Sequence, residues 1–134
     1  MLFIILILVL VLILNSKDWT QDYESENILM RLDDLAPAFI KYENNSIYPA
    51  DNIWEATGIE FMCPICYLND DKEHSIICWD SSIPQYVLPN PGRWDLEGND
   101  FEDLSLIGNT TSSVRLMGGC RAHFLIKDGN VIGE

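Results

Sequence analysis

The chain has 134 residues, enough for one domain, and 48% of them are hydrophobic, which excludes a wholly disordered protein. Its formal net charge is −13, and its 8 Lys and Arg residues are scattered singly. Nucleic acids and anionic membrane surfaces are bound through clustered basic side chains, so neither is favoured as a partner. A protein partner is expected instead.

The N-terminal segment, residues 1–14, is uninterrupted apolar sequence, and the acidic residues 15–29 predict a linker. A helix of this length would rise about 21 Å, short of the hydrocarbon core of about 30 Å. The segment also lacks the basic start and small-residue cleavage site of a signal peptide. Three interpretations stay open: a short transmembrane anchor, a cleaved signal, or sequence upstream of a true start at Met30.

The choice of start matters for the thiols. A start at Met30 predicts a cytoplasmic protein with reduced cysteines, whereas a real leader predicts a membrane-anchored or exported chain. In an oxidising compartment the four cysteines would tend to form two disulfides.

The predicted domain covers residues 30–134. A short helical turn is expected at 32–35, and the residues 44–50 predict a turn-rich loop. Alternating side chains at 59–63 and again at 74–79 predict a hairpin, with a Cys-Pro-Ile-Cys turn near its tip. Period two places His74, Ile76 and Cys78 on one face of the return strand.

The residues 80–93 carry three prolines and predict a long irregular loop. We expect Arg93 to hydrogen-bond the carbonyls of this loop or a carboxylate. Short strands are predicted at 94–98, 104–106 and 113–117.

The clearest hairpin spans 122–132, because Asp128-Gly129 between apolar runs suits a type I′ turn. The sequence therefore predicts a mainly β, small antiparallel domain with long loops and little helix.

Two pairs of potential metal ligands share the same two-residue gap. Cys63 and Cys66 form the first pair, and Cys120 and His123 form the second, after Gly118-Gly119. A tight turn lets both members of such a pair reach about 2.3 Å from one ion, and a Cys₃His set is typical of structural zinc. We therefore predict that these four residues bind zinc and that the small antiparallel β-domain is zinc-ribbon-like.

Two further residues lie close to this pattern. His74 could replace His123 as the fourth ligand or orient a ligand from outside, and it is also the candidate base if the site were catalytic. Cys78 is expected to be a buried thiol, with metal ligation as the alternative.

Five motifs in this order resemble an uncharacterised family of small proteins from tailed phages and prophages. The matching segments are 58–66, 74–79, 91–94, 103–106 and 118–124. The resemblance runs from about Met30 to the C-terminus. The family is a domain of unknown function, so the resemblance implies no activity, but it implies that His74 and Cys78 matter beside the four proposed ligands.

The function that these features favour is a phage-type accessory module, stabilised by structural zinc, that docks a protein partner through its loops. One alternative is a zinc-dependent hydrolase that uses His74 near the metal. The sequence lacks the HExxH motif and has no His-x-Glu ahead of its cysteine pair, so a non-enzymatic role is preferred. The other alternative is an exported, disulfide-stapled, membrane-tethered domain.

Overall fold

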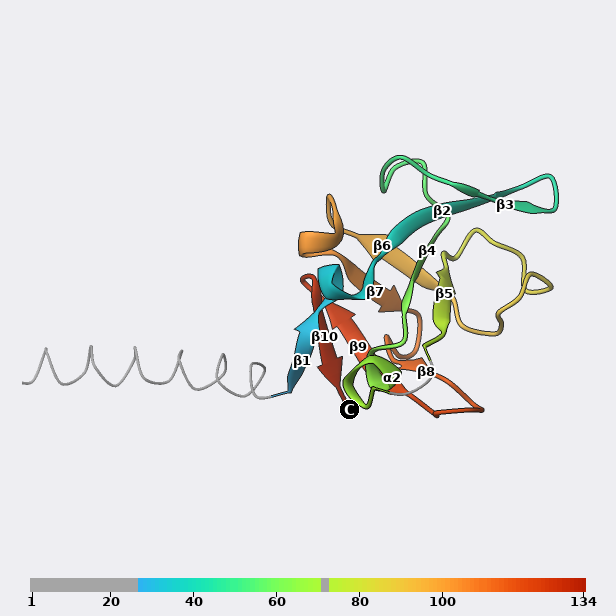
Figure 1. Ribbon diagram of the computed structural model, residues 1–134. Coiled ribbons are helices and arrows are strands. Elements are labelled where there is room, and N and C mark those ends of the chain that lie inside the picture. The colour runs from blue at the N-terminus through green and yellow to red at the C-terminus, as the bar shows by residue number, and fades with distance from the viewer. Residues whose placement is uncertain (1–26, 71–72) are drawn as a thin grey trace, which may run out of the picture.

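The fold consists mainly of antiparallel β-strands, and the computed structural model describes residues 27–70 and 73–134 (Figure 1). The first sheet contains, in spatial order, β1 (Ile28–Arg31), β10 (Asn130–Gly133), β9 (His123–Lys127) and β8 (Val114–Arg115). The second sheet contains β3 (Ser46–Pro49), β2 (Ala38–Glu43), β4 (Gly58–Met62) and β5 (Ser75–Trp79). A separate ribbon pairs β6 (Trp94–Glu97) with β7 (Ser105–Gly108).

Helical structure is limited to short pieces. They are α2 (Pro64–Leu68) and the 3₁₀ helices η1 (Leu32–Leu35) and η2 (Phe101–Asp103). The helical turn predicted at 32–35 is therefore confirmed, as are the mainly β composition and the scarcity of helix.

The domain boundary lies slightly earlier than predicted. Ile28 pairs with Ile132 in the first sheet, so the last two residues of the predicted linker belong to β1. The apolar segment 1–14 and the rest of the linker up to residue 26 lie outside the described residues. Within the described ranges, no helix is long and apolar enough to cross a membrane.

Two predicted hairpins are present with the expected partners. β4 pairs with β5 through the whole of both strands, and β9 pairs with β10. At the second turn Asp128 and Gly129 have φ values of 51° and 75°. Positive φ at both central residues is what a type I′ turn requires, so the turn prediction is confirmed.

The predicted loop at 44–50 is instead a hairpin, in which β2 pairs with β3. Its turn residues Asn44 and Asn45 have φ values of 50° and 62°, a conformation that asparagine tolerates better than most residues. Every residue of β3 is exposed. The strand therefore carries no apolar alternation by which the sequence could reveal it.

The larger core lies between the two four-stranded sheets. Phe61 on β4 and Phe124 on β9 meet edge to face, with ring centroids 6.0 Å apart. Both side chains are almost completely buried. The same cluster includes Cys63 and Cys66, so these two thiols lie at the margin of the core.

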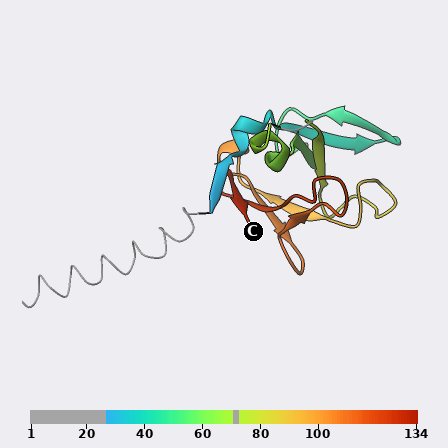
Figure 2. The same cartoon turned by 60° about the horizontal axis from the view of Figure 1, so that its bottom comes forward.

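A smaller core lies under the irregular loop 80–93. Ile83 and Val87 from this loop pack with Ile40 and Trp79 of the second sheet. The guanidinium of Arg93 donates hydrogen bonds of 2.6–2.9 Å to five loop carbonyls, those of Ile83, Pro84, Val87, Pro89 and Gly92. The predicted role of Arg93 is confirmed. In two views the loop lies on the same side of the molecule as the β2–β3 hairpin (Figure 1, Figure 2).

Candidate metal centre

Three potential ligands come from the connection between β4 and β5. Cys63 directly follows β4, Cys66 lies on the single turn of α2, and His74 directly precedes β5. Pro64 at the first helical position suits the turn, because its fixed φ is helical and its missing N–H has no partner there in any helix. The amide of Cys63 donates to the carbonyl of His74 over 2.9 Å and closes the base of the connection.

The register of the β4–β5 hairpin explains the position of His74. Gly58 faces Trp79 and Met62 faces Ser75, so the next pair along the ladder is Cys63 with His74. Cross-strand partners project their side chains to the same face of a sheet. Here that face also carries Phe61 and Ile76, both buried, and it meets the core.

The fourth ligand, Cys120, lies in the connection between β8 and β9. Gly119 and Arg121 on either side of it have φ values of 61° and 51°, so the chain turns tightly here. The amide of Leu116 donates to the carbonyl of Ala122 over 2.9 Å and closes this loop. Because β8 and β9 belong to the first sheet, Cys120 approaches the other three ligands from across the core.

The four donor atoms are close enough to share one ion. All four lie within 4.8 Å of one another. The Sγ atoms of Cys63 and Cys120 are 3.6 Å apart, and Sγ of Cys120 is 3.5 Å from Nε2 of His74. Tetrahedral ligands at zinc distances are separated by about 3.8 Å for two sulfurs and about 3.5 Å for sulfur and nitrogen. The geometry therefore fits a tetrahedral metal ion.

The sulfur atoms do not form disulfides. All four cysteines are free, and a disulfide would bring the sulfurs to about 2.05 Å. Three thiols with one imidazole, and no carboxylate in the group, are the donors preferred by zinc and other soft tetrahedral ions. The group could thus hold a metal ion.

The site has a buried side and an exposed side. Cys63 and Cys66 are buried, whereas His74 and Cys120 are exposed to solvent. The ion would lie where the core meets the surface, with two ligands anchored by packing and two reachable by water.

The thiols differ in acidity according to their surroundings. Burial, together with the adjacent thiols of Cys120 and Cys63, raises the pKa of Cys66 to about 12. Burial also raises the pKa of Cys63, against hydrogen bonds from the amides of Cys66 and Ile65. Burial acts in the same direction on Cys120, but hydrogen bonds from His74 and the Ala122 amide lower its pKa to about 7. A bound cation would have to displace the protons from the two buried thiols.

His123 lies outside the group of donor atoms, contrary to the predicted ligand set. It belongs to β9, where the buried Ala122 and Phe124 project into the core and His123 projects to the opposite face. Its Nε2 is 2.6 Å from Oε2 of Glu134. The Cys-x-x-His spacing brings both ligands to one ion only within a turn, and here the strand has already begun at His123.

Cys78 also lies outside the group. It is fully buried on β5 opposite Ile59, and burial raises its pKa. The predicted buried thiol is confirmed. The alternative ligand His74, by contrast, occupies the fourth position, and the signal that could have identified it is its place opposite Cys63 in the predicted hairpin.

The ligands are also arranged differently from those of a zinc ribbon. Such a fold draws two ligands from each of two hairpin turns, whereas here one connection supplies three and the other supplies only Cys120. The zinc-ribbon likeness is therefore not supported, although the small antiparallel β-fold is confirmed.

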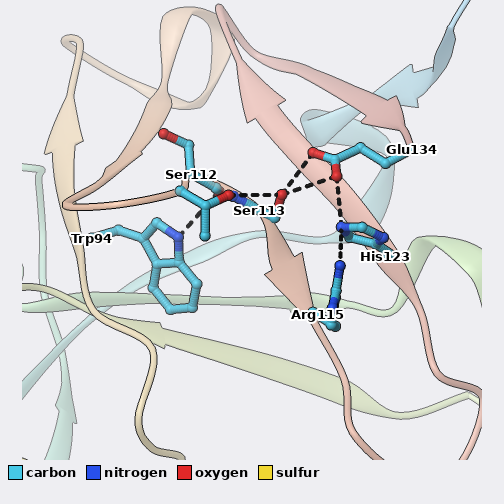
Figure 3. A network of polar contacts seen from close by, with 7 residues as sticks. Trp94, Ser112, Ser113, Arg115, His123 and Glu134 are labelled. Atoms are coloured by element: carbon cyan, nitrogen blue, oxygen red, sulfur yellow. Dashed lines mark hydrogen bonds and ion pairs between the residues drawn. The ribbon is translucent and has the colours of Figure 1, made fainter.

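A second polar network surrounds His123 (Figure 3). The hydroxyl of Ser113 donates to the carboxylate of Glu134 at 2.8 Å, and the same carboxylate accepts from His123. In a catalytic triad the imidazole lies between the hydroxyl and the acid. Here the acid lies in the middle, so the imidazole does not activate Ser113, and the network joins β8, β9 and β10 instead.

Comparison with protein-family models, with curated proteins and with solved structures finds no match for this chain.

Proposed function

We propose that this chain is a small β module in which one Zn²⁺, bound by Cys63, Cys66, His74 and Cys120, clamps two sheets together. The observation that carries the proposal is the origin of the ligands. Three come from the β4–β5 connection of one sheet and the fourth from the β8–β9 connection of the other. An ion at this point ties together two segments that are 57 positions apart.

The proposed role of the ion is structural. Four protein ligands complete the tetrahedral shell that is typical of structural zinc, whereas a catalytic site keeps one position for water. The hydrolase alternative needs His74 as a base beside the metal. Because the imidazole of His74 itself supplies one of the four donor atoms, nothing in the described residues favours that alternative.

We further propose that the module is an accessory protein that docks another protein. Several large apolar side chains are solvent-exposed, and aromatic residues and Met are enriched in protein interfaces. Tyr86, Leu88 and Met117 are each at least 71% exposed. The acidic composition and scattered basic residues also favour a protein over a nucleic acid. The phage-type setting is supported by the resemblance of the five sequence motifs.

Metal analysis of the full-length chain with a matched pair of histidine variants tests the zinc clamp. We expect about one zinc ion per chain, as the closed site predicts. Replacement His74→Ala should reduce the zinc content or the affinity for zinc at least about tenfold, as loss of a direct ligand does. Replacement His123→Ala should leave the zinc content unchanged. Equal zinc loss in both variants, or a folded wild-type chain without metal, would contradict the proposal.

A further inference from the structure

A groove of about 480 Å³ lies between the two sheets beside the metal centre. Its long walls are residues 74–77, which include the first part of β5, and residues 113–117, which include β8. The volume lies within the range of about 300–1,000 Å³ that is usual for ligand sites. Both walls are edges, because β5 ends the second sheet and β8 ends the first.

The backbone of β5 presents free hydrogen-bonding groups to this groove. Two backbone bonds at the ends of β5 show which of its residues bond to β4. One runs from the Cys63 amide to the His74 carbonyl, and the other from the Asp80 amide to the Thr57 carbonyl. The residues that bond to β4 are the even-numbered ones, since bonded positions alternate along an antiparallel strand. The N–H and C=O groups of Ser75 and Ile77 therefore point away from β4.

The backbone of the opposite wall is arranged in the same way. The amide of Leu116 bonds to the carbonyl of Ala122 in β8–β9 pairing, so Val114 also bonds to β9. Arg115 and Met117, at the alternate positions, point their backbone groups away from β9. Such unpaired edges are templates for an added strand.

Both ends of the groove are tied. At one end Trp94 forms a bridge with Asp80, just after β5, and its indole N–H donates to the Ser112 carbonyl, just before β8, over 3.2 Å (Figure 3). At the other end are His74, just before β5, and Cys120, just after the second wall. The two walls thus run in opposite directions and are held before anything binds, which lowers the entropic cost of binding.

We propose that an extended segment of a partner protein binds in this groove as an additional β-strand between β5 and β8. The inference rests on the proposed function, because the metal clamp holds the two walls at one end. The added strand would accept and donate main-chain hydrogen bonds on both of its sides, at Ser75 and Ile77 on one wall and at Arg115 on the other.

The lining of the groove specifies the side chains of the segment. Ile77, Leu116 and Met117 make the lining apolar, and Met117 is 83% exposed. The ionisable side chains among the described lining residues are His74 and Arg115, with no carboxylate, in a chain that has 21 Asp and Glu. The segment should therefore carry apolar side chains at alternate positions and one acidic side chain opposite Arg115.

The test is selection from a yeast-displayed library of random peptides of about ten residues, the length of a long strand, against the full-length zinc-loaded chain. Binding of the recovered peptides is then measured with edge variants. Ser75→Pro removes an amide that faces the groove and leaves the bonds to β4 in place. Its matched control is Ile47→Pro on β3, which is also an edge strand. The Ala50 amide bonds to the Phe39 carbonyl, and bonded positions alternate along the strand, so the amide of Ile47 faces away from β2.

A second pair of variants avoids any change in the backbone. Met117→Asp places a charge in the groove, and Trp54→Asp does so at a similarly exposed site outside it. We expect recovered peptides with alternating apolar residues and an acidic residue. Ser75→Pro and Met117→Asp should weaken their binding at least about tenfold, the effect of about one lost buried interaction. The two controls should not change it.

Several results would overturn the proposal: no recovered peptide, apolar residues spaced as on a helix, or equal weakening by Ile47→Pro. The proposal would also be overturned if the wild-type chain self-associated and Ser75→Pro abolished this self-association, because a second copy would then fill the groove. The zinc content of each variant is measured in parallel. Peptide binding by a folded chain that contains no zinc would refute the clamp and still support the docking groove.

Discussion

His74 lies directly opposite Cys63 across the β4–β5 ladder, and the Cys63 amide donates to the His74 carbonyl over 2.9 Å. This pairing sends the imidazole and the thiol to the same face of the sheet, at the margin of the core. Cys66 joins them from the turn of α2, and only Cys120 comes from a distant part of the chain. The β4–β5 hairpin thus places three of the ligands close together, and the packing of the other sheet brings the fourth beside them.

The two buried cysteines Cys63 and Cys78 should respond differently to replacement by serine. Cys63→Ser removes a proposed ligand and should abolish zinc binding, with loss of most of the stability that the ion provides. Cys78→Ser buries a hydroxyl in the apolar core, which should cost about 1–3 kcal/mol without any loss of zinc. The zinc content of both variants and their free energy of unfolding in urea test these two expectations. A Cys63→Ser chain with full zinc content would refute the ligand assignment.

The carboxylate of Asp103 should stabilise the fold in a pH-dependent way. It accepts hydrogen bonds from the amides of Asn99 and Asp100, each at 2.9 Å, and from the Asn99 side chain. Hydrogen bonds from the Asp100 and Asn99 amides, followed by the Asn99 side chain, lower the pKa of Asp103. A lowered pKa means that the stabilisation is complete above the unfolded value of about 3.9 and is lost as the pH falls through the folded value.

The variant Asp103→Asn should therefore be less stable than the wild type at neutral pH, and the difference should vanish in acid. The free energy of unfolding in urea, measured from neutral pH to below pH ~4, tests this. Asp33→Asn, an exposed carboxylate of η1, is the control. A difference that stays constant over this range would show that the charge of Asp103 plays no part.

Arg93 should be the main support of the loop 80–93. Its guanidinium binds five carbonyls, and desolvation by burial lowers its pKa, against the attraction of Asp80. Arg93→Ala would leave several carbonyls without a protein partner and should destabilise the fold by about 2 kcal/mol. It should also speed proteolysis within the loop. Arg121→Ala at an exposed position serves as the control, and equal proteolysis of the two variants would contradict this role.

A chain started at Met30 should be less stable than one started at Asn27. The shorter chain lacks Ile28 and Leu29, although Ile28 pairs with Ile132 and Leu29 packs against the core. Loss of this partly buried surface should cost about 1–2 kcal/mol. Thermal denaturation of the two truncated chains tests the expectation. Equal midpoints would mean that β1 contributes nothing before Met30.

The strands with alternating or apolar residues could be predicted from sequence, because such residues report which face is buried. The β4–β5 and β9–β10 hairpins are of this kind. The sequence predicts a loop in place of the β2–β3 hairpin, because β3 has no alternation of apolar and polar residues. All residues of β3 are exposed, so no face of the strand needs to be apolar. The one local sign of this hairpin is the Asn44-Asn45 pair, which is weaker than an Asn-Gly or Asp-Gly turn.

The sequence by itself determined that this chain is a small β-protein with closely spaced thiols and a proline-rich irregular loop at 80–93. These features depend on local spacing, turn chemistry and alternation. Only the tertiary structure decided which histidine joins the three thiols, because that choice depends on which face of each strand meets the core. His74 shares the face of Phe61 and Ile76, whereas His123 lies on the face opposite Phe124. The packing of one sheet on the other then brings Cys120 to within 3.6 Å of Cys63.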